Sequence, residues 1–173
     1  LARDTGSTAL FGIINGNSLF VIAKYEGSQS IGVTIRLGHR FHITAGAHGK
    51  AIVAFMPEKE RNKILERDRL FFHGDSSMLD RPRLNEELMQ CRTTGYSIDI
   101  GELSPGITAV ASPVFNSQDS LIGALFVIGI FREPQIAEYG RMVALNAIQV
   151  SRMLGADIEK TYRIIAETGK EAI

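Results

Sequence analysis

The chain has 173 residues, 45% of them hydrophobic and 22% charged, which suits one globular domain with a sizeable core. Nineteen Lys and Arg balance nineteen Asp and Glu, so no net charge draws the chain to nucleic acid or to an anionic membrane. The single cysteine, Cys91, excludes an internal disulfide, and no segment resembles a signal peptide or a bilayer-spanning run, so we expect a cytoplasmic protein without a membrane partner.

The first predicted element is the end of a helix. Residues 1–6, "LARDTG", are typical of a last helical turn that ends at Gly6. Because no initiator Met precedes this turn, we expect further chain before it in the natural protein. Residues 7–26 predict a β-hairpin, since two apolar segments flank the turn sequence "NGN" at 15–17.

The middle of the chain changes from a strand period to a helix period. Residues 32–38, "GVTIRLG", alternate apolar and polar side chains, which predicts a strand with one covered face. Residues 49–55 form an apolar block that suits a buried helix, and Pro57 opens a second helix. A third helix ends near Gly95 and places three apolar residues at helical spacing, namely Leu84, Leu88 and Cys91.

The second half predicts strands at 96–100, 107–115 and 121–131, with a turn at 116–120. We expect the strand at 121–131 to be central and buried on both faces. A long helix follows, whose apolar face comprises Ile136, Tyr139, Val143, Ala147, Val150 and Leu154 and resumes at Ile158, Tyr162 and Ile165. We expect this stripe to offer a surface for self-association. The order of elements predicts an α+β domain with a mainly antiparallel sheet.

The stretch "TAGAHGKAIVAF" at 44–55 contains a Gly–Lys pair before a predicted helix. A phosphate-binding P-loop needs Gly and Ser or Thr where this chain has Thr44 and Ala51, so a nucleotide P-loop is excluded. Two alternatives remain. The free N–H groups of a helix start favour a carboxylate or phosphate, whereas the small residues also suit tight packing of a helix on a sheet.

Asp99 stands between Ile98 and Ile100 on a predicted strand. If the isoleucines face the core, Asp99 points to the opposite side, into solvent or into a pocket, and Glu102 just beyond the strand has the same alternatives. On the strand at 121–131, alternation places Ile122, Ala124, Phe126 and Ile128 on one face, which without further information predicts core packing.

Metal and nucleophile chemistry find little support. His39 and His42 are three residues apart in an extended segment, so they face opposite sides and share a metal poorly. A zinc site of His48, Asp99 and Cys91 is a weak alternative. Cys91 lies on a helical apolar stripe, where an inert buried thiol is expected, and no G-x-S-x-G nucleophile motif occurs. We therefore predict no metal, no cofactor and no enzymatic activity.

Three segments in order resemble the C-terminal effector-binding domain of IclR-type bacterial transcription regulators. They are "ITAGAHGKAIVAFMPEKER" at 43–61, "LNEELMQCRTTGYSIDIGELSPGITAVASPVFN" at 84–116, and the strand "LIGALFVIG" followed by a helix containing "SRMLG" at 151–155. The resemblance spans about residues 1–155, and its middle block is the most specific.

The resemblance implies a GAF-like fold that binds a small metabolite. It divides the chain into an effector-binding domain at 1–155 and a helical extension at 156–173. In the family an N-terminal winged helix-turn-helix domain reads operator DNA, and no such segment is found in this chain. The resemblance thus implies transcription regulation, with DNA as a partner only through that missing domain, and self-association into a dimer or tetramer.

The resemblance also implies a set of effector contacts. The expected site comprises Gly46, Ala47, His48, Gly49, Asp99, Ile107, Ala109, Phe126 and Ile128. The backbone at Ala47 and His48 matches the family's contact with the effector anion, and Asp99 matches the family's pocket aspartate. Phe126 and Ile128 fall where glyoxylate-responsive members carry serines. Their apolar side chains imply a more hydrophobic carboxylate effector, or a pocket that Phe126 itself fills.

Two alternatives to an effector sensor stay open. One is a GAF-like module that binds a nucleotide or a chromophore, for which Cys91 is the candidate attachment point. The other is a ligand-free dimerisation domain.

Overall fold

The computed structural model describes residues 1–29 and 32–162. One antiparallel sheet forms its centre, with the strand order β3-β2-β1-β6-β5-β4. The strands are β1 (Thr8–Asn15), β2 (Ser18–Tyr25), β3 (Arg40–His42), β4 (Ser97–Ile100), β5 (Thr108–Phe115) and β6 (Leu121–Gly129). The helices are α1 (Ala2–Thr5), α2 (Gly46–Phe55), α3 (Glu58–Leu65), α4 (Arg81–Thr94), α5 (Glu133–Met153) and α6 (Ile158–Thr161), with a 3-10 turn at Ser76–Met78. The predicted α+β class and antiparallel sheet are confirmed.

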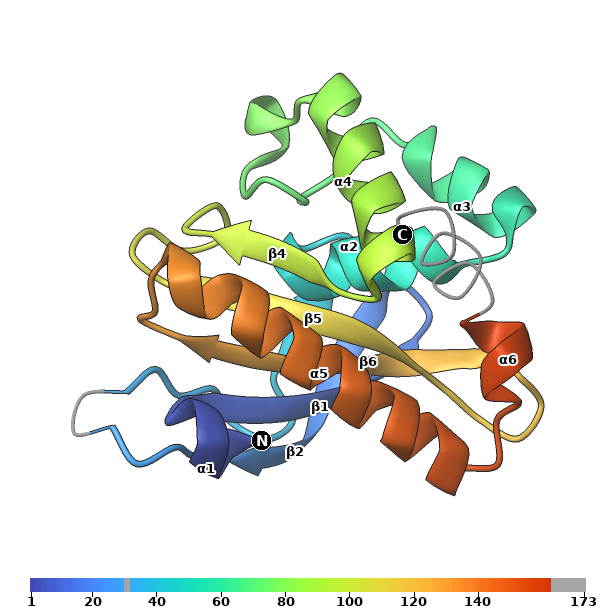
Figure 1. Ribbon diagram of the computed structural model, residues 1–173. Coiled ribbons are helices and arrows are strands. Elements are labelled where there is room, and N and C mark those ends of the chain that lie inside the picture. The colour runs from blue at the N-terminus through green and yellow to red at the C-terminus, as the bar shows by residue number, and fades with distance from the viewer. Residues whose placement is uncertain (30–31, 163–173) are drawn as a thin grey trace, which may run out of the picture.

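The sheet separates two layers of helix (Figure 1). Helix α5 crosses one face, where Val110 and Val127 pack with Tyr139 and Val143. Helix α2 covers the other face, and α4 and α3 pack against α2. Below, the α2 side of the sheet is called the inner face and the α5 side the outer face.

Local sequence explains most of these elements. The predicted hairpin is β1 and β2, which pair from Asn15 with Ser18 outward around the turn. The predicted helix end at Gly6 is confirmed, since Gly6 closes α1 in a left-handed conformation. Helix α4 begins with an Asp80 side-chain cap, and its last residue, Thr94, directly precedes Gly95, which confirms the predicted end near Gly95. Strand β6 lies between β1 and β5 and alternates between the two faces as expected.

Two expectations about these elements are wrong. Residues 32–38 are not a strand, although Val33 and Ile35 do pack toward the core while Thr34 and Arg36 stay exposed. Alternating burial needs only one covered face, whereas a strand also needs a hydrogen-bonded neighbouring strand. In this segment the first backbone hydrogen bond to β2 appears only at its end, where the N–H of Gly38 donates to the carbonyl of Val21 at 2.7 Å.

The apolar stripe of α5 is not a free surface. Four of its residues are buried within this chain, namely Ile136, Tyr139, Val143 and Ala147, and the first three pack with residues of the sheet. Leu145 and Met153 are exposed apolar residues of α5, with Leu154 just beyond its end. The continuation is confirmed only as the single turn of α6, and the predicted Ile165 and the remainder of the extension lie outside the described residues.

Candidate functional site

A cavity of about 280 Å³ lies on the inner face of the sheet. The first turn of α2, segment 33–41, the loop 101–107 and strands β4 to β6 enclose it. The lining residues are Val33, Thr34, Ile35, His39, Phe41, Ala47, His48, Asp99, Leu103, Ser104, Ile107, Ala109, Phe126 and Ile128. Seven of the nine residues predicted for the site, all except Gly46 and Gly49, therefore meet at one cavity.

Strand register brings the sheet residues together. Asp99 on β4 pairs with Ala109 on β5, and Ala109 pairs with Ile128 on β6. Residues paired across adjacent strands point to the same face, so these three form one row across the cavity wall. Phe126 lies two residues before Ile128 on the same face and is 1% exposed. Phe126 lines the cavity but leaves about 280 Å³ open, which disfavours the alternative that its side chain fills the pocket.

The first turn of α2 supplies backbone donors. The N–H of Gly46 donates to the carbonyl of Phe71 at 3.3 Å, and the N–H of Gly49 donates to the carbonyl of Ala45 at 2.9 Å. For the N–H groups of Ala47 and His48, in contrast, no acceptor is found among residues 1–29 and 32–162. The first N–H groups of a helix have no partner inside the helix and carry partial positive charge. Two such donors therefore belong to residues of the cavity wall.

The two glycines have packing roles in place of the predicted effector contact. Gly46 has a φ of 49°, and a Cβ there would lie 2.6 Å from Oδ2 of Asp99, so glycine lets β4 and α2 approach closely. A Cβ at Gly49 would lie 2.5 Å from the carbonyl carbon of Thr44, so this residue faces back into the turn before α2. Close packing therefore accounts for glycine at both positions without any contact to a ligand.

Asp99 points into the cavity side of the sheet, and only one of the flanking isoleucines behaves as expected. Ile98 packs in the outer core, but Ile100 is 58% exposed, whereas Asp99 is 3% exposed. Oδ1 of Asp99 accepts the N–H of Glu102 at 2.9 Å, and Oδ2 accepts the N–H of Leu103 at 3.2 Å. Burial raises the pKa of Asp99, and the positive charge of Lys50 opposes this. The carboxyl group thus holds the loop that carries Leu103 and Ser104 over the cavity.

A buried ion cluster next to this loop was not predicted. Nζ of Lys50, 1% exposed, lies 2.7 Å from Oε2 of Glu102, 2.9 Å from Oε2 of Glu87 and 3.1 Å from the carbonyl oxygen of Ile98. Arg83 contacts the same two carboxylates. Glu102 therefore does not point into solvent but ties the loop to α2. The sequence did contain a signal for this cluster, namely a lysine within the apolar block at 49–55, because a buried lysine needs acidic or carbonyl partners.

This cluster also contains the one group of potential metal ligands within the described residues. Ligand atoms of His73, Glu87 and Glu102 lie within 4.8 Å of one another. The ammonium group of Lys50 already lies between the two carboxylates, so a cation there would have to displace a buried, paired charge. His48, Asp99 and Cys91 do not form such a group among these residues, so the zinc alternative loses its geometric basis.

The side chain of His48 was missed, because the sequence drew attention to its backbone only. Its ring packs between Phe41, with centroids 4.5 Å apart, and Phe126, at 5.3 Å. The side chain is 3% exposed, and burial, with a smaller contribution from His39, lowers its pKa to about 3. His48 is therefore neutral at neutral pH. A histidine at the start of an apolar helix that faces aromatic strand residues was the signal available.

Cys91 does not suit a chromophore linkage. It is 1% exposed on the buried side of α4, is not part of the cavity wall, and burial raises its pKa to about 12. A thiol attacks as the thiolate, which this environment disfavours. Cys91 is a core residue, as the helical stripe predicted.

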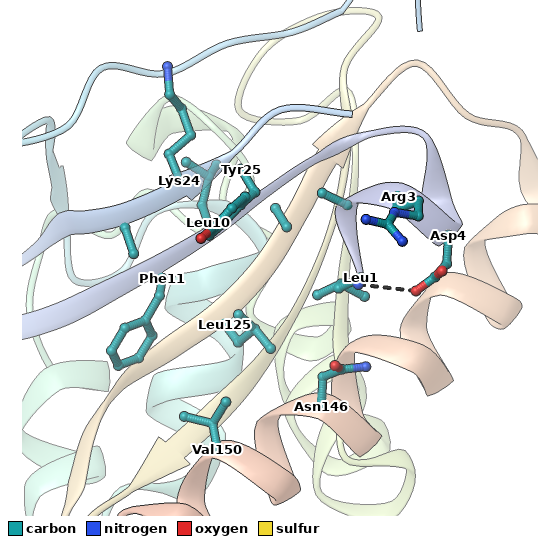
Figure 2. Close-up of a pocket in the computed structure, with 13 residues that line it drawn as sticks. Leu1, Arg3, Asp4, Leu10, Phe11, Lys24, Tyr25, Leu125, Asn146 and Val150 are labelled. Atoms are coloured by element: carbon teal, nitrogen blue, oxygen red, sulfur yellow. Dashed lines mark ion pairs between the residues drawn. The ribbon is translucent and has the colours of Figure 1, made fainter. Parts of the chain in front are cut away.

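A larger hollow of about 580 Å³ opens on the outer face, and Figure 2 shows its lining. Leu1 and Arg3 of the N-terminal segment lie on one side, Phe11 and Leu125 on the sheet, and Val150 on α5. Some of its charged groups are paired near the surface, for example the Leu1 amino group with Asp4 at 3.1 Å. No predicted site residue contributes to this outer groove. In the described part of the chain no helix is long and apolar enough to cross a membrane.

Known proteins resemble this chain over most of its length. It is 30% identical over 158 residues to the HTH-type transcriptional regulator XynR of Escherichia coli, a match that covers 90% of this chain and 63% of that protein. The crystal structure of the Thermotoga maritima IclR matches with a TM-score of 0.78 and 32% identity, over 88% of this chain and 63% of that one. The crystal structure of the C-terminal domain of the Escherichia coli transcriptional regulator KdgR matches with a TM-score of 0.69 and 25% identity, over 90% of this chain and 92% of that one.

These relatives are transcriptional regulators and their family is non-enzymatic, which agrees with the prediction that this chain has no enzymatic activity. The chain spans about 63% of the length of the first relatives it matches. The division of the chain at residue 155 stays a prediction. The family model described as "Bacterial transcriptional regulator IclR C-terminal" matches residues 1–152, and the chain therefore belongs to the IclR family of transcription regulators, as its C-terminal regulatory domain.

Proposed function

We propose that this domain senses a small, rather apolar carboxylate that binds in the inner cavity. The observation that carries the proposal is the combination of an apolar cavity with two backbone N–H groups, at Ala47 and His48, that have no acceptor in the described chain. An anion at the N-terminus of a helix is stabilised by these donors and by the helix dipole. At about 280 Å³ the cavity is slightly below the usual size of ligand pockets, about 300–1,000 Å³, so it suits a small ligand.

The remaining walls favour an apolar body on the ligand. Ile107, Ala109, Phe126 and Ile128 bring no hydrogen-bonding side-chain group, and Leu103 covers them from the loop. A tiny oxo-acid such as glyoxylate would leave this apolar surface uncovered, whereas a ring or short acyl chain would bury it. Burial of apolar area contributes about 25 cal/mol per Å².

Asp99 would complete the site from β4. Its two oxygens accept the N–H groups of Glu102 and Leu103, which leaves further acceptor capacity for a ligand hydroxyl. Because Asp99 also holds the loop 101–106, a ligand that touches it bears on the loop and, through Glu102, on Lys50 and α2.

Regulation would follow from linkage. The effector must bind one assembly state of the regulator more tightly than another, because equal affinity for both shifts nothing. We propose that this chain assembles as a dimer or tetramer and that effector binding changes the spacing of the DNA-reading domains that lie outside it. Operator DNA is then a partner of the whole regulator and not of this domain.

Calorimetric titration of the purified domain with benzoate and with glyoxylate tests the proposed effector class. We expect benzoate to bind and to raise the melting temperature with saturation, since a ligand of the folded state stabilises it by mass action. A clear preference for glyoxylate would refute the apolar-carboxylate assignment. Absence of binding by either acid and by short acyl carboxylates would instead favour a ligand-free dimerisation domain.

A further inference from the structure

The ring of His48 occupies a special place in the inner cavity. It projects from the first turn of α2, lines the cavity and lies between the rings of Phe41 and Phe126. The Phe126 ring is inclined to it by 36°, so the two rings present a partly stacked wall. His48 therefore brings a flat aromatic surface and two ring nitrogens to the lining of the proposed site.

One of these nitrogens has an unmet hydrogen bond. Nε2 of His48 is the only buried side-chain nitrogen or oxygen for which the described part of the chain provides no partner. Other buried polar groups nearby are paired: the hydroxyl of Ser97 donates to the carbonyl of Ala47 at 2.6 Å, and that of Ser112 donates to the carbonyl of Gly95 at 2.7 Å. Leaving a buried polar atom unpaired is costly, so such an atom calls for an explanation.

The protonation state limits what can pair with Nε2. Burial keeps the pKa of His48 far below its usual value, so the imidazole is neutral and has one donor and one acceptor nitrogen. An uncharged hydroxyl or carbonyl matches such a group. A second carboxylate or an ammonium group beside Nε2 would lose its hydration, and the neutral imidazole offers no opposite charge to offset that cost.

We infer that His48 is a specificity-determining residue, whose Nε2 pairs with a second, uncharged polar group on the effector. This inference rests on the proposed function, since the carboxylate of the same ligand occupies the N–H groups of α2. The ligand class is then a flat apolar carboxylate that bears one hydroxyl or oxo substituent, with its body against Phe41 and Phe126.

The test is a titration of wild type, His48→Phe and His48→Gln with three probes, namely benzoate, 3-hydroxybenzoate and 4-hydroxybenzoate. In the wild type we expect at least one hydroxybenzoate to bind about three- to tenfold more tightly than benzoate, the worth of one net hydrogen bond. His48→Phe keeps a flat ring but removes Nε2, so this ratio should fall to about one. His48→Gln keeps a polar atom at similar reach and should restore part of the ratio.

His42→Phe is the matched control, because His42 also packs on an aromatic ring, that of Phe71 at 4.9 Å, but does not line the cavity. This variant should keep the wild-type ratio. An NMR experiment on the wild type alone covers the case in which a variant does not fold. The Nε2 resonance of His48 should move with the preferred hydroxybenzoate and much less with benzoate.

The outcomes separate the two proposals. If benzoate binds but no hydroxybenzoate gains over it, or if the gain survives in His48→Phe, the role of His48 is refuted while the carboxylate site stands. If none of the three acids binds the wild type, the inference fails, and the proposed function fails as well when short acyl carboxylates also do not bind.

Discussion

The two faces of the sheet carry two hollows of different character. The outer groove has about 580 Å³ and the inner cavity about 280 Å³. Around the groove, Asp4 pairs with the Leu1 amino group and Lys24 pairs with Glu26, both near the surface. The smaller cavity instead is lined by a buried carboxyl group at Asp99 and by residues with a buried ring nitrogen, at His48, and two backbone donors that find no partner among residues 1–29 and 32–162. Volume alone would favour the outer groove, whereas unmet hydrogen bonds in an apolar enclosure are the basis for proposing the inner cavity.

We expect the largest difference between the two faces in the unfolding free energy lost when one lysine on each face is replaced. Lys50→Met leaves Glu87 and Glu102 without their central cation, and losing one partner of a buried pair costs about 3–5 kcal/mol of unfolding free energy. Lys24→Met removes the ion pair with Glu26 near the outer groove and should change little. Urea denaturation of both variants measures this. Equal stability of the two would mean that the buried cluster does not fasten the loop.

The next largest effect depends on pH. The folded-state pKa of His48, about 3, lies below its ordinary value of 6.5, so below pH 6.5 the unfolded chain binds more protons than the folded chain. Stability is therefore fully present above about pH 6.5 and falls by about 1.4 kcal/mol per unit as pH decreases toward 3. At pH 5 this amounts to about 2 kcal/mol.

Subtraction isolates the contribution of His48. The difference in unfolding free energy between wild type and His48→Phe should change with pH between 7.5 and 5, because only the wild type carries this group. Parallel pH profiles would show that the His48 ring is solvated and hence that the inner cavity is not a dry enclosure.

A third experiment compares the two hollows with the same substitution. Ala109→Leu should fill part of the inner cavity and weaken benzoate binding by more than tenfold, because the added side chain takes the ligand's space. Ala23→Leu makes the same change on the wall of the outer groove and should leave the affinity unchanged. The reverse pattern in calorimetry would place the ligand in the groove.

The smallest effect concerns the loop. Asp99→Ala removes the acceptor for the N–H groups of Glu102 and Leu103, which should lower the unfolding free energy by about 1 kcal/mol. We expect benzoate affinity to fall by about tenfold, because the loop that carries Leu103 over the cavity is no longer held in place, and this is a larger relative loss than that of stability. An unchanged isotherm would remove Asp99 from the binding site, and Asp4→Ala beside the outer groove is the control.

The sequence predicted the elements well where local signals agree with the final packing. The turn at 15–17 and the stop at Gly95 need only neighbouring residues, and both are confirmed. Residues 32–38 show the limit of periodicity, since alternation there reflects one covered face without a paired strand. The stripe on α5 shows another, because period alone cannot say which partner covers it, and here it is the chain's own sheet.

The site was only partly accessible from the sequence. Resemblance placed Asp99, Ala109 and Ile128 in it, and strand register explains how they meet. The role of Gly46 and the cluster around Lys50 depend on contacts between segments about 50 residues apart, which no local pattern encodes. The unpaired Nε2 of His48 is visible only once every neighbouring hydrogen bond is assigned.

The most direct test of the central claim is a map of backbone amide shifts in the NMR spectrum as benzoate is added to the wild-type domain. A carboxylate held by the start of α2 should move the amide resonances of Ala47 and His48 most, with smaller changes at Leu103. The amides of Phe11 and Leu125 in the outer groove should stay in place. Saturable shifts centred on Phe11 and Leu125, with Ala47 and His48 unmoved, would contradict the account.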